Sequence, residues 1–179
     1  MRVIAGRAKG TRLGPVPRGT RPVSDRAREG VFSSLGPAVV GARALDLYAG
    51  TGAMGIEALS RGAAICTFVD SSRAATLAIE DNLARTRSSD QGEVVRSEAG
   101  AFLARGEAQY DVIILDPPYD LDPGILGEVL DALRPHLATS ATLVLTRPTR
   151  DATDVIPVYL QVAKRLSYGD TRVLVLEAT

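Results

Sequence analysis

The sequence predicts an α/β protein built on a doubly wound, mostly parallel sheet of seven strands. Two observations support this fold class. Between residues 42 and 147, short apolar runs alternate with stretches of helical periodicity, which is the pattern of right-handed crossovers between parallel strands. Residues 158–179 instead hold two apolar runs joined by the short turn "YGD". Such a short connection predicts an antiparallel hairpin at one edge of the sheet.

Residues 1–22 are expected to form a small basic extension, and residues 23–179 the main domain. The chain has no net charge, yet its first 30 residues carry eight basic side chains against two acidic ones. Glycines and prolines in this segment predict a hairpin with strands at residues 2–6 and 11–16, followed by an extended loop. Guanidinium groups suit phosphate, so the extension is either an arm that meets a phosphate-bearing partner or a solvated surface segment.

The elements of the main domain follow in order. A first helix is expected over "SDRAREGVFSSLG", with Ser24 or Asp25 as its cap and Gly36 near its end. Each later strand comes before a helix or an edge turn. Strands are expected at residues 42–48, 64–70, 93–97, 110–116 and 141–147, and helices at 53–62, 72–86, around 102–103 and at 124–135.

In doubly wound sheets, ligands bind at the carboxyl ends of the strands. After the first strand, Gly50, Gly52 and Gly55 match the spacing G-x-G-x-x-G, which serves several nucleotides. Asp46 would repel a pyrophosphate but would suit a cationic or amino group. Asp70 ends the second strand and could accept hydrogen bonds from ribose hydroxyls. This set favours a nucleoside that carries an amino acid; the alternative is a glycine turn with two helix-capping aspartates.

The motif "DPPY" ends the most apolar strand. Neither Pro117 nor Pro118 has an N–H group, so the turn is stiff and its carbonyl groups are free to accept hydrogen bonds. The carboxylate of Asp116 beside such a carbonyl would receive an NH₂ group, and the ring of Tyr119 offers a face for a base. The motif therefore predicts a receptor for an amino group, although an isolated motif of this kind can also be a strand-ending turn. It resembles the D/N-P-P-Y/F motif of methyltransferases that act on amino nitrogens of bases or of glutamine, which implies methyl transfer by direct displacement, without a covalent enzyme intermediate.

Composition excludes several kinds of chemistry. Cys66 is the one cysteine and His136 the one histidine, so neither an internal disulfide nor a sulfur and imidazole metal site is expected. No apolar run approaches the roughly 20 residues of a membrane span, and the first residues lack the apolar core of a signal peptide. A cytoplasmic protein is expected.

The sheet pattern and the loop "LDLYAGTGAMG" resemble class I S-adenosylmethionine-dependent methyltransferases, a Rossmann-like fold. The resemblance implies S-adenosylmethionine as the cofactor. Asp46 would contact its methionine end, the loop from Ala49 to Gly52 would pass under it, and Asp70 would hold its ribose. After the third strand, Ser97, Glu98 and the amide of Ala99 are candidates for the adenine contact. The full set of expected cofactor-binding residues is Asp46, Ala49, Gly50, Gly52, Asp70, Ser71, Glu98, Ala99 and Asp116.

The segments "RVIAGRAKGTRL", "RPVSDRAREGVFSSL", "ILDPPY" and "YGDTRVLVLE" resemble the bacterial RsmD family over nearly the whole chain. The resemblance implies methylation of N2 of guanine 966 in 16S ribosomal RNA, within a small ribosomal subunit or an assembly intermediate, by a monomeric enzyme. Asp116, Pro117 and Tyr119 would form the amine pocket, with Arg21, Ser24, Asp25 and Arg28 beside the entrance. The RNA contacts would come from Arg7, Lys9, Arg12, Arg18, Arg21 and Arg28.

Three alternatives stay open. Spacing does not distinguish guanine N2 from adenine N6, so another RNA or DNA could be the substrate. A dinucleotide-dependent oxidoreductase would use the same glycines, but it gives Asp46 and "DPPY" no function. A non-catalytic RNA-binding module would explain the basic extension alone.

Overall fold

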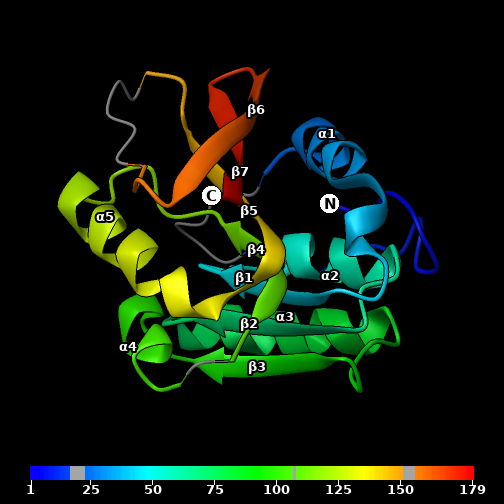
Figure 1. Ribbon diagram of the computed structural model, residues 1–179. Coiled ribbons are helices and arrows are strands. Elements are labelled where there is room, and N and C mark those ends of the chain that lie inside the picture. The colour runs from blue at the N-terminus through cyan, green and yellow to red at the C-terminus, as the bar shows by residue number, and fades with distance from the viewer. Residues whose placement is uncertain (17–22, 107, 151–155) are drawn as a thin grey trace.

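The computed structural model describes residues 1–16, 23–106, 108–150 and 156–179 of the chain. Within these residues, seven strands form one sheet in the order β3-β2-β1-β4-β5-β7-β6 (Figure 1). The strands are β1 (Arg43–Leu47), β2 (Ile65–Asp70), β3 (Gly92–Arg96), β4 (Tyr110–Leu115), β5 (Leu137–Pro148), β6 (Leu160–Tyr168) and β7 (Thr171–Ala178). The helices are α1 (Asp25–Leu35), α2 (Ala53–Ser60), α3 (Arg73–Arg85), α4 (Ala99–Leu103) and α5 (Pro123–Ala132), with 3-10 turns η1 (Gly36–Val39) and η2 (Arg134–His136).

The strand directions confirm the predicted fold class. β1 pairs in parallel with β2 and with β4, and the pairs β2–β3 and β4–β5 are also parallel. β7 lies antiparallel between β5 and β6, which is the hairpin predicted at the edge. Because the strand order reverses between β1 and β4, the carboxyl ends of these two strands flank the crevice where such sheets bind ligands.

Helices cover both faces of the sheet (Figure 1). One buried cluster joins α1, α2 and α3 to strand residues such as Ala44 and Ile114, and the other joins α4 and α5 to strand residues such as Leu45 and Leu115. Alternate residues of each strand therefore face opposite layers. Both layers are apolar, which explains why the central strands read as continuous apolar runs.

Two predicted helices begin at a side-chain cap, and the cap at Ser24 is one of the two that the sequence offered. The side chain of Ser24 accepts a hydrogen bond from the N–H of Ala27 at 3.2 Å, and that of Ser72 accepts one from Ala75 at 3.3 Å. Each cap satisfies a backbone donor that the first turn of the helix leaves unpaired. The chain therefore enters α1 and α3 at defined points.

The basic extension differs from the expected hairpin. Within residues 1–16 its two arms do pair, through one antiparallel bridge between Arg2 and Arg12 and hydrogen bonds such as that from the N–H of Val3 to the carbonyl of Thr11, but neither arm forms a regular strand. Val3, Ala8 and Leu13 are buried in the core cluster of α1, α2 and α3. These apolar side chains pack the extension onto the domain, without pairing its described residues to a strand of the sheet.

Glu57 of α2 is the polar anchor of the extension. Its carboxylate accepts hydrogen bonds from the backbone N–H groups of Ile4 at 2.8 Å and Ala5 at 3.0 Å. Ser60 of the same helix accepts from the N–H of Ala8 and donates to the carbonyl of Ala5. The backbone N–H groups of Ile4, Ala5 and Ala8 thus use side chains of α2 in place of a partner strand.

Cys66 and His136 are both buried in the fold. The two ring nitrogens of His136 lie 2.9 Å from the carbonyl oxygens of Ala108 and Leu103, so the ring joins η2 to the end of α4. No helix in the part of the chain that the structure describes is long and apolar enough to cross a membrane.

Candidate active site

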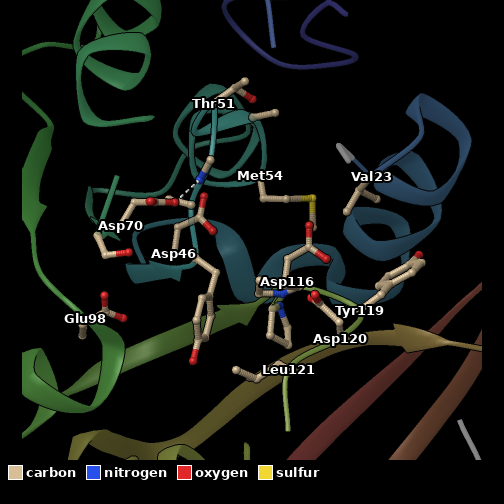
Figure 2. Close-up of a pocket in the computed structure, with 17 residues that line it drawn as sticks. Val23, Asp46, Thr51, Met54, Asp70, Glu98, Asp116, Tyr119, Asp120 and Leu121 are labelled. Atoms are coloured by element: carbon tan, nitrogen blue, oxygen red, sulfur yellow. Dashed lines mark hydrogen bonds between the residues drawn. The ribbon is translucent and has the colours of Figure 1, made fainter. Parts of the chain in front are cut away.

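A cavity of about 560 Å³ opens at the carboxyl ends of β1, β2 and β4 (Figure 2). This volume is within the range of pockets that bind a small ligand or cofactor. Nine residues predicted as site residues line it: Asp46, Ala49, Gly50, Asp70, Ser71, Glu98, Asp116, Pro117 and Tyr119. Thr51, within the loop from Ala49 to Gly52 that was predicted to pass under the cofactor, lines it too. Seven lining residues were not predicted: Val23, Tyr48, Ala53, Met54, Pro118, Asp120 and Leu121.

Figure 2 separates the polar lining into two groups. Asp46, Asp70 and Glu98 lie on one side of the cavity, and Asp116, Tyr119 and Asp120 lie on the other. The first group comes from the ends of β1 and β2 and from the residue before α4, and the second from the turn after β4. One cavity thus contains both predicted sites, the glycine-loop site and the "DPPY" site.

Asp46 is 1% exposed, and its Oδ2 atom accepts a hydrogen bond from the N–H of Gly55 at 2.8 Å. Burial raises the pKa of this carboxyl well above its ordinary value, and the charges of Asp116 and Asp70 act in the same direction. A cationic group in the cavity would offset the cost of burying the negative charge and so favour the ionised form of Asp46. The environment of Asp46 therefore fits an ammonium group.

Asp70 fixes the shape of the glycine loop. Its Oδ2 atom accepts from the N–H of Gly50 and its Oδ1 atom from the N–H of Ser72, both at 2.9 Å (Figure 2 draws the first). These bonds join the end of β2 to the loop after β1. Each carboxylate oxygen keeps a further lone pair for a ligand hydroxyl.

Two glycines of the loop are needed for packing and conformation. Gly52 has φ of 73°, in the left-handed region that favours glycine, and α2 begins directly after it. A Cβ atom on Gly55 would lie 2.3 Å from the ring of Phe68, so only glycine lets α2 lie this close to β2. Gly52 and Ala99, both predicted as cofactor contacts, are buried and are not among the residues that line the cavity.

Tyr48 is a lining residue that the sequence did not reveal. It follows β1 directly and has φ of 59°, which is uncommon for a residue other than glycine. Burial raises the pKa of its hydroxyl, and so does the charge of Glu98. The hydroxyl therefore stays protonated at neutral pH and can donate a hydrogen bond. Only its place directly before the glycine loop could have indicated a role.

The turn after β4 is held from two sides. The N–H of Asp116 donates to the carbonyl of Leu47 in β1 at 3.4 Å. Burial raises the pKa of the Asp116 carboxyl to about 6, although the hydroxyl of Thr146 donates a hydrogen bond to its Oδ1 atom and acts in the opposite direction. The hydroxyl of Tyr119 lies 2.5 Å from that of Thr171 in β7. The turn thus presents a fixed carboxylate and a fixed aromatic ring.

The structure corrects one predicted RNA contact. Arg28 is 0% exposed, and its guanidinium group donates to the carbonyl of Arg2 at 2.6 Å and to Asp25 at 2.8 Å. Its Nε atom is 3.8 Å from the buried carboxylate of Glu57. The prediction that Arg28 contacts RNA is wrong, because its positive charge is compensated inside the fold by carboxylates of α1 and α2.

The other predicted RNA contacts fall into three groups. Arg7 is exposed, but its guanidinium group donates to Ser88 and Gln91. Lys9 and Arg12 are exposed on the extension. Arg18 and Arg21 lie outside the described residues.

The sheet order, the glycine loop after β1 and the acidic residues at the ends of β1 and β2 define the class of protein: class I S-adenosylmethionine-dependent methyltransferases. A family model described as "Conserved hypothetical protein 95" matches residues 1–177. The chain is 37% identical over 161 residues to Ribosomal RNA small subunit methyltransferase D of Escherichia coli, which covers 88% of this chain and 79% of that protein. This chain belongs to the RsmD family of methyltransferases.

Solved structures agree with this assignment. The Escherichia coli protein yhhF superposes with a TM-score of 0.88 at 33% identity, over 99% of this chain and 97% of that one. The fold is also shared with SMU.776, solved in complex with SAH, with a TM-score of 0.64 at 14% identity over 82% of this chain and 48% of that one. The cofactor of this methyltransferase is S-adenosylmethionine. The residues present fit it, because the buried Asp46 suits its amino group and Asp70 suits its ribose.

Proposed function

We propose that this protein methylates N2 of guanine 966 in 16S ribosomal RNA, within a small ribosomal subunit or an assembly intermediate in the cytoplasm. The observation that carries the proposal is that one cavity holds both the carboxylates suited to the cofactor and the rigid turn suited to an amine. The RsmD-family relative from Escherichia coli is named for the small-subunit RNA. The enzyme acts as a monomer in this proposal.

The cofactor occupies the half of the cavity near β1 and β2. S-adenosylmethionine supplies an activated methyl group when bound. Asp46 would hold its amino group, Asp70 its ribose and Glu98 the adenine end, with Ala49 and Gly50 beneath it. The charges of the aspartates are suited to these roles, because burial favours a cationic partner and two oxygens can accept from a diol.

The guanine amine occupies the half near the turn after β4. An exocyclic amine is a poor nucleophile because its lone pair is delocalised into the ring. The carboxylate of Asp116 and the carbonyl group of Pro117 would accept hydrogen bonds from the two N–H groups of the amine. These bonds would direct the nitrogen lone pair toward the methyl group. Catalysis then consists of positioning and electrostatic stabilisation, which explains why the turn is stiff.

Tyr119 would hold the base itself. Its ring lines the cavity beside the carboxylate, and stacking on an aromatic ring is a common way to hold an unstacked base. A paired guanine could not bring N2 into such a cavity, so the target must be unpaired or flipped out. The enzyme would therefore act on a loop or on RNA that is opened locally.

The RNA backbone would follow the basic extension. A second cavity, of about 320 Å³, lies between the extension and α1, and the exposed basic residues Arg2, Lys9 and Arg26 line it. Asp25 and Glu29 also line this cavity, but Asp25 is paired with a buried arginine of α1. Phosphate contacts of this kind position an RNA without reading its sequence.

Transfer of labelled methyl from S-adenosylmethionine tests the proposal. The acceptors are small ribosomal subunits, free 16S RNA and DNA, all from cells that lack this gene, and the labelled nucleoside is then identified. Label in N2-methylguanosine at one RNA position supports the proposal and shows which assembly state is the substrate. Label in N6-methyladenosine or in DNA would contradict the proposed substrate. The absence of label from every acceptor would favour a non-catalytic RNA-binding module.

A further inference from the structure

Thr146 has no assigned role, yet it lies beside the carboxylate at the centre of the amine site. It is near the end of β5, in the register position that follows the parallel pair Leu115 and Leu145. The residue that directly follows β4 on the neighbouring segment is Asp116, and the Thr146 hydroxyl donates a hydrogen bond to its Oδ1 atom. This contact depends on the β4–β5 register and not on a short sequence separation.

The environment of Thr146 leaves its hydroxyl few other roles. Its side chain is 0% exposed, and it does not line the cavity among the described residues. A buried hydroxyl needs a hydrogen-bond partner, and an apolar residue of similar shape would fill the same space without that need. Val144 and Val173 lie in the same layer, so valine is a residue that this face accommodates.

We propose that Thr146 is a positioning residue for methyl transfer: its hydrogen bond holds Oδ1 of Asp116, so that Oδ2 is left to accept a hydrogen bond from the target amine. This inference rests on the proposed function of Asp116. Thr146 acts through Asp116 and does not touch the substrate.

The surroundings of Asp116 show in which direction the loss of the Thr146 hydroxyl would move the pKa of its carboxyl. Burial raises the pKa of its carboxyl to about 6, and the bond from Thr146 limits the rise. Asp46 lies on the adjacent strand β1, and the charge of Asp116 raises the pKa of its carboxyl. Tyr119 and Asp120 are the titratable residues that follow Asp116 on the turn, and both line the cavity. The residues that face the cavity from the α1 and α2 side, Val23 and Met54, carry no charge. Without the donor, the pKa of Asp116 would rise further.

Three variants test the inference: Thr146→Val, which removes the hydroxyl at similar volume; Thr146→Ser, which keeps it; and Thr142→Val, a control on the same strand. The rate of methyl transfer is measured from pH 5 to pH 9 with saturating RNA and cofactor. Thr146→Val is expected to lower kcat roughly 10-fold at pH 7 and to move the acidic limb of the profile upward by about one pH unit, with KM for RNA little changed. For Thr146→Ser and Thr142→Val, the acidic limb of the rate profile should stay at the pH found for the unaltered enzyme.

The outcomes separate this inference from the proposed function. An unaltered enzyme that transfers no methyl to RNA would overturn the proposed function. An active enzyme whose Thr146→Val variant, folded by circular dichroism, keeps both kcat and the acidic limb would overturn the positioning role alone. If Thr146→Val did not fold, Thr146→Ala would replace it, and Thr146→Ser must still match the unaltered profile. The inference would also be overturned if the acidic limb of the pH–rate profile of Thr146→Ser were shifted as far as that of the alanine variant.

Discussion

The hydroxyl group of Tyr119 lies 2.5 Å from that of Thr171, so the first residue of β7 fixes the ring that ends the "DPPY" turn. Tyr119 and Thr171 are far apart in the chain and meet because β7 inserts between β5 and β6. In the sheet, Thr171 pairs with Pro148, two residues after Thr146. Adjacent strands thus supply one hydroxyl to Asp116 and another to Tyr119.

The Tyr119 hydrogen bond predicts a pattern of variants. Tyr119→Phe and Thr171→Val should each raise KM for RNA about 5-fold, because each removes the same hydrogen bond, worth about 1 kcal/mol. The double variant should be no worse than either single one, since the two changes share one interaction. Tyr119→Ala should cost more, by about 1–3 kcal/mol, because the stacking face is removed. Steady-state kinetics with an RNA acceptor measures all four; additive effects of the two single changes would contradict the shared bond.

Arg28 is predicted to be a stability residue. Arg28→Met keeps the length of the side chain but removes the charge that faces Asp25 and Glu57. The free energy of unfolding should fall by about 2–4 kcal/mol, because a buried carboxylate loses part of its compensation. Urea denaturation measures the change. Arg26→Met, an exposed position of the same helix, should stay within about 0.5 kcal/mol. A folded Arg28→Met protein of normal stability but with little RNA affinity would instead make Arg28 an RNA-binding residue.

The exposed cations of the extension are predicted to bind RNA phosphate. Replacing Lys9 and Arg12 with glutamine should weaken RNA binding and lower the slope of log affinity against log salt by roughly 0.7 for each phosphate that these side chains neutralise. Cofactor affinity should not change, because neither residue lines the larger cavity. Filter binding across a salt series measures the slope, with Arg85→Gln on α3 as the control. A collapse of cofactor affinity instead would place the extension in the cofactor site.

The strand-end carboxylates could be predicted from sequence because the rule behind them is local. Asp46 lies one residue before the end of β1, Asp70 ends β2 and Asp116 follows β4 directly. Parallel strands bring their carboxyl ends to one edge of the sheet. The glycine spacing, the capped helices and the closing hairpin follow from equally local signals. The fold and the three strand-end carboxylates of the cavity were therefore predictable.

The remaining parts depend on contacts between distant segments. The support of Asp116 by Thr146 requires the β4–β5 register, which hydrophobic pattern alone does not give. The positive φ of Tyr48 runs against the usual preference of its residue type. Arg28 resembles part of a basic arm because sequence shows its charge but not the buried Glu57 that faces it. In the extension, Glu57 of α2 bonds backbone N–H groups such as that of Ile4, a contact between distant segments that the sequence does not show.

Asp116 is predicted to lower the stability of the protein at neutral pH. Burial raises the pKa of its carboxyl from 3.8 to about 6. The native state therefore holds this proton more tightly than the unfolded chain, which stabilises the protein below about pH 4. That contribution disappears as the pH rises from about 4 through 6, where the native state must ionise a buried carboxyl.

Asp116→Asn removes this ionisation while the amide oxygen can still accept the bond from Thr146. The variant should gain about 1–3 kcal/mol in free energy of unfolding at pH 7 and much less at pH 4. It should lose methyl transfer by a factor of about 100 or more, because the amine then meets a neutral group in place of a carboxylate. Urea denaturation at both pH values measures the difference. An equal gain at pH 4 and pH 7 would show that the stabilisation does not come from the buried charge.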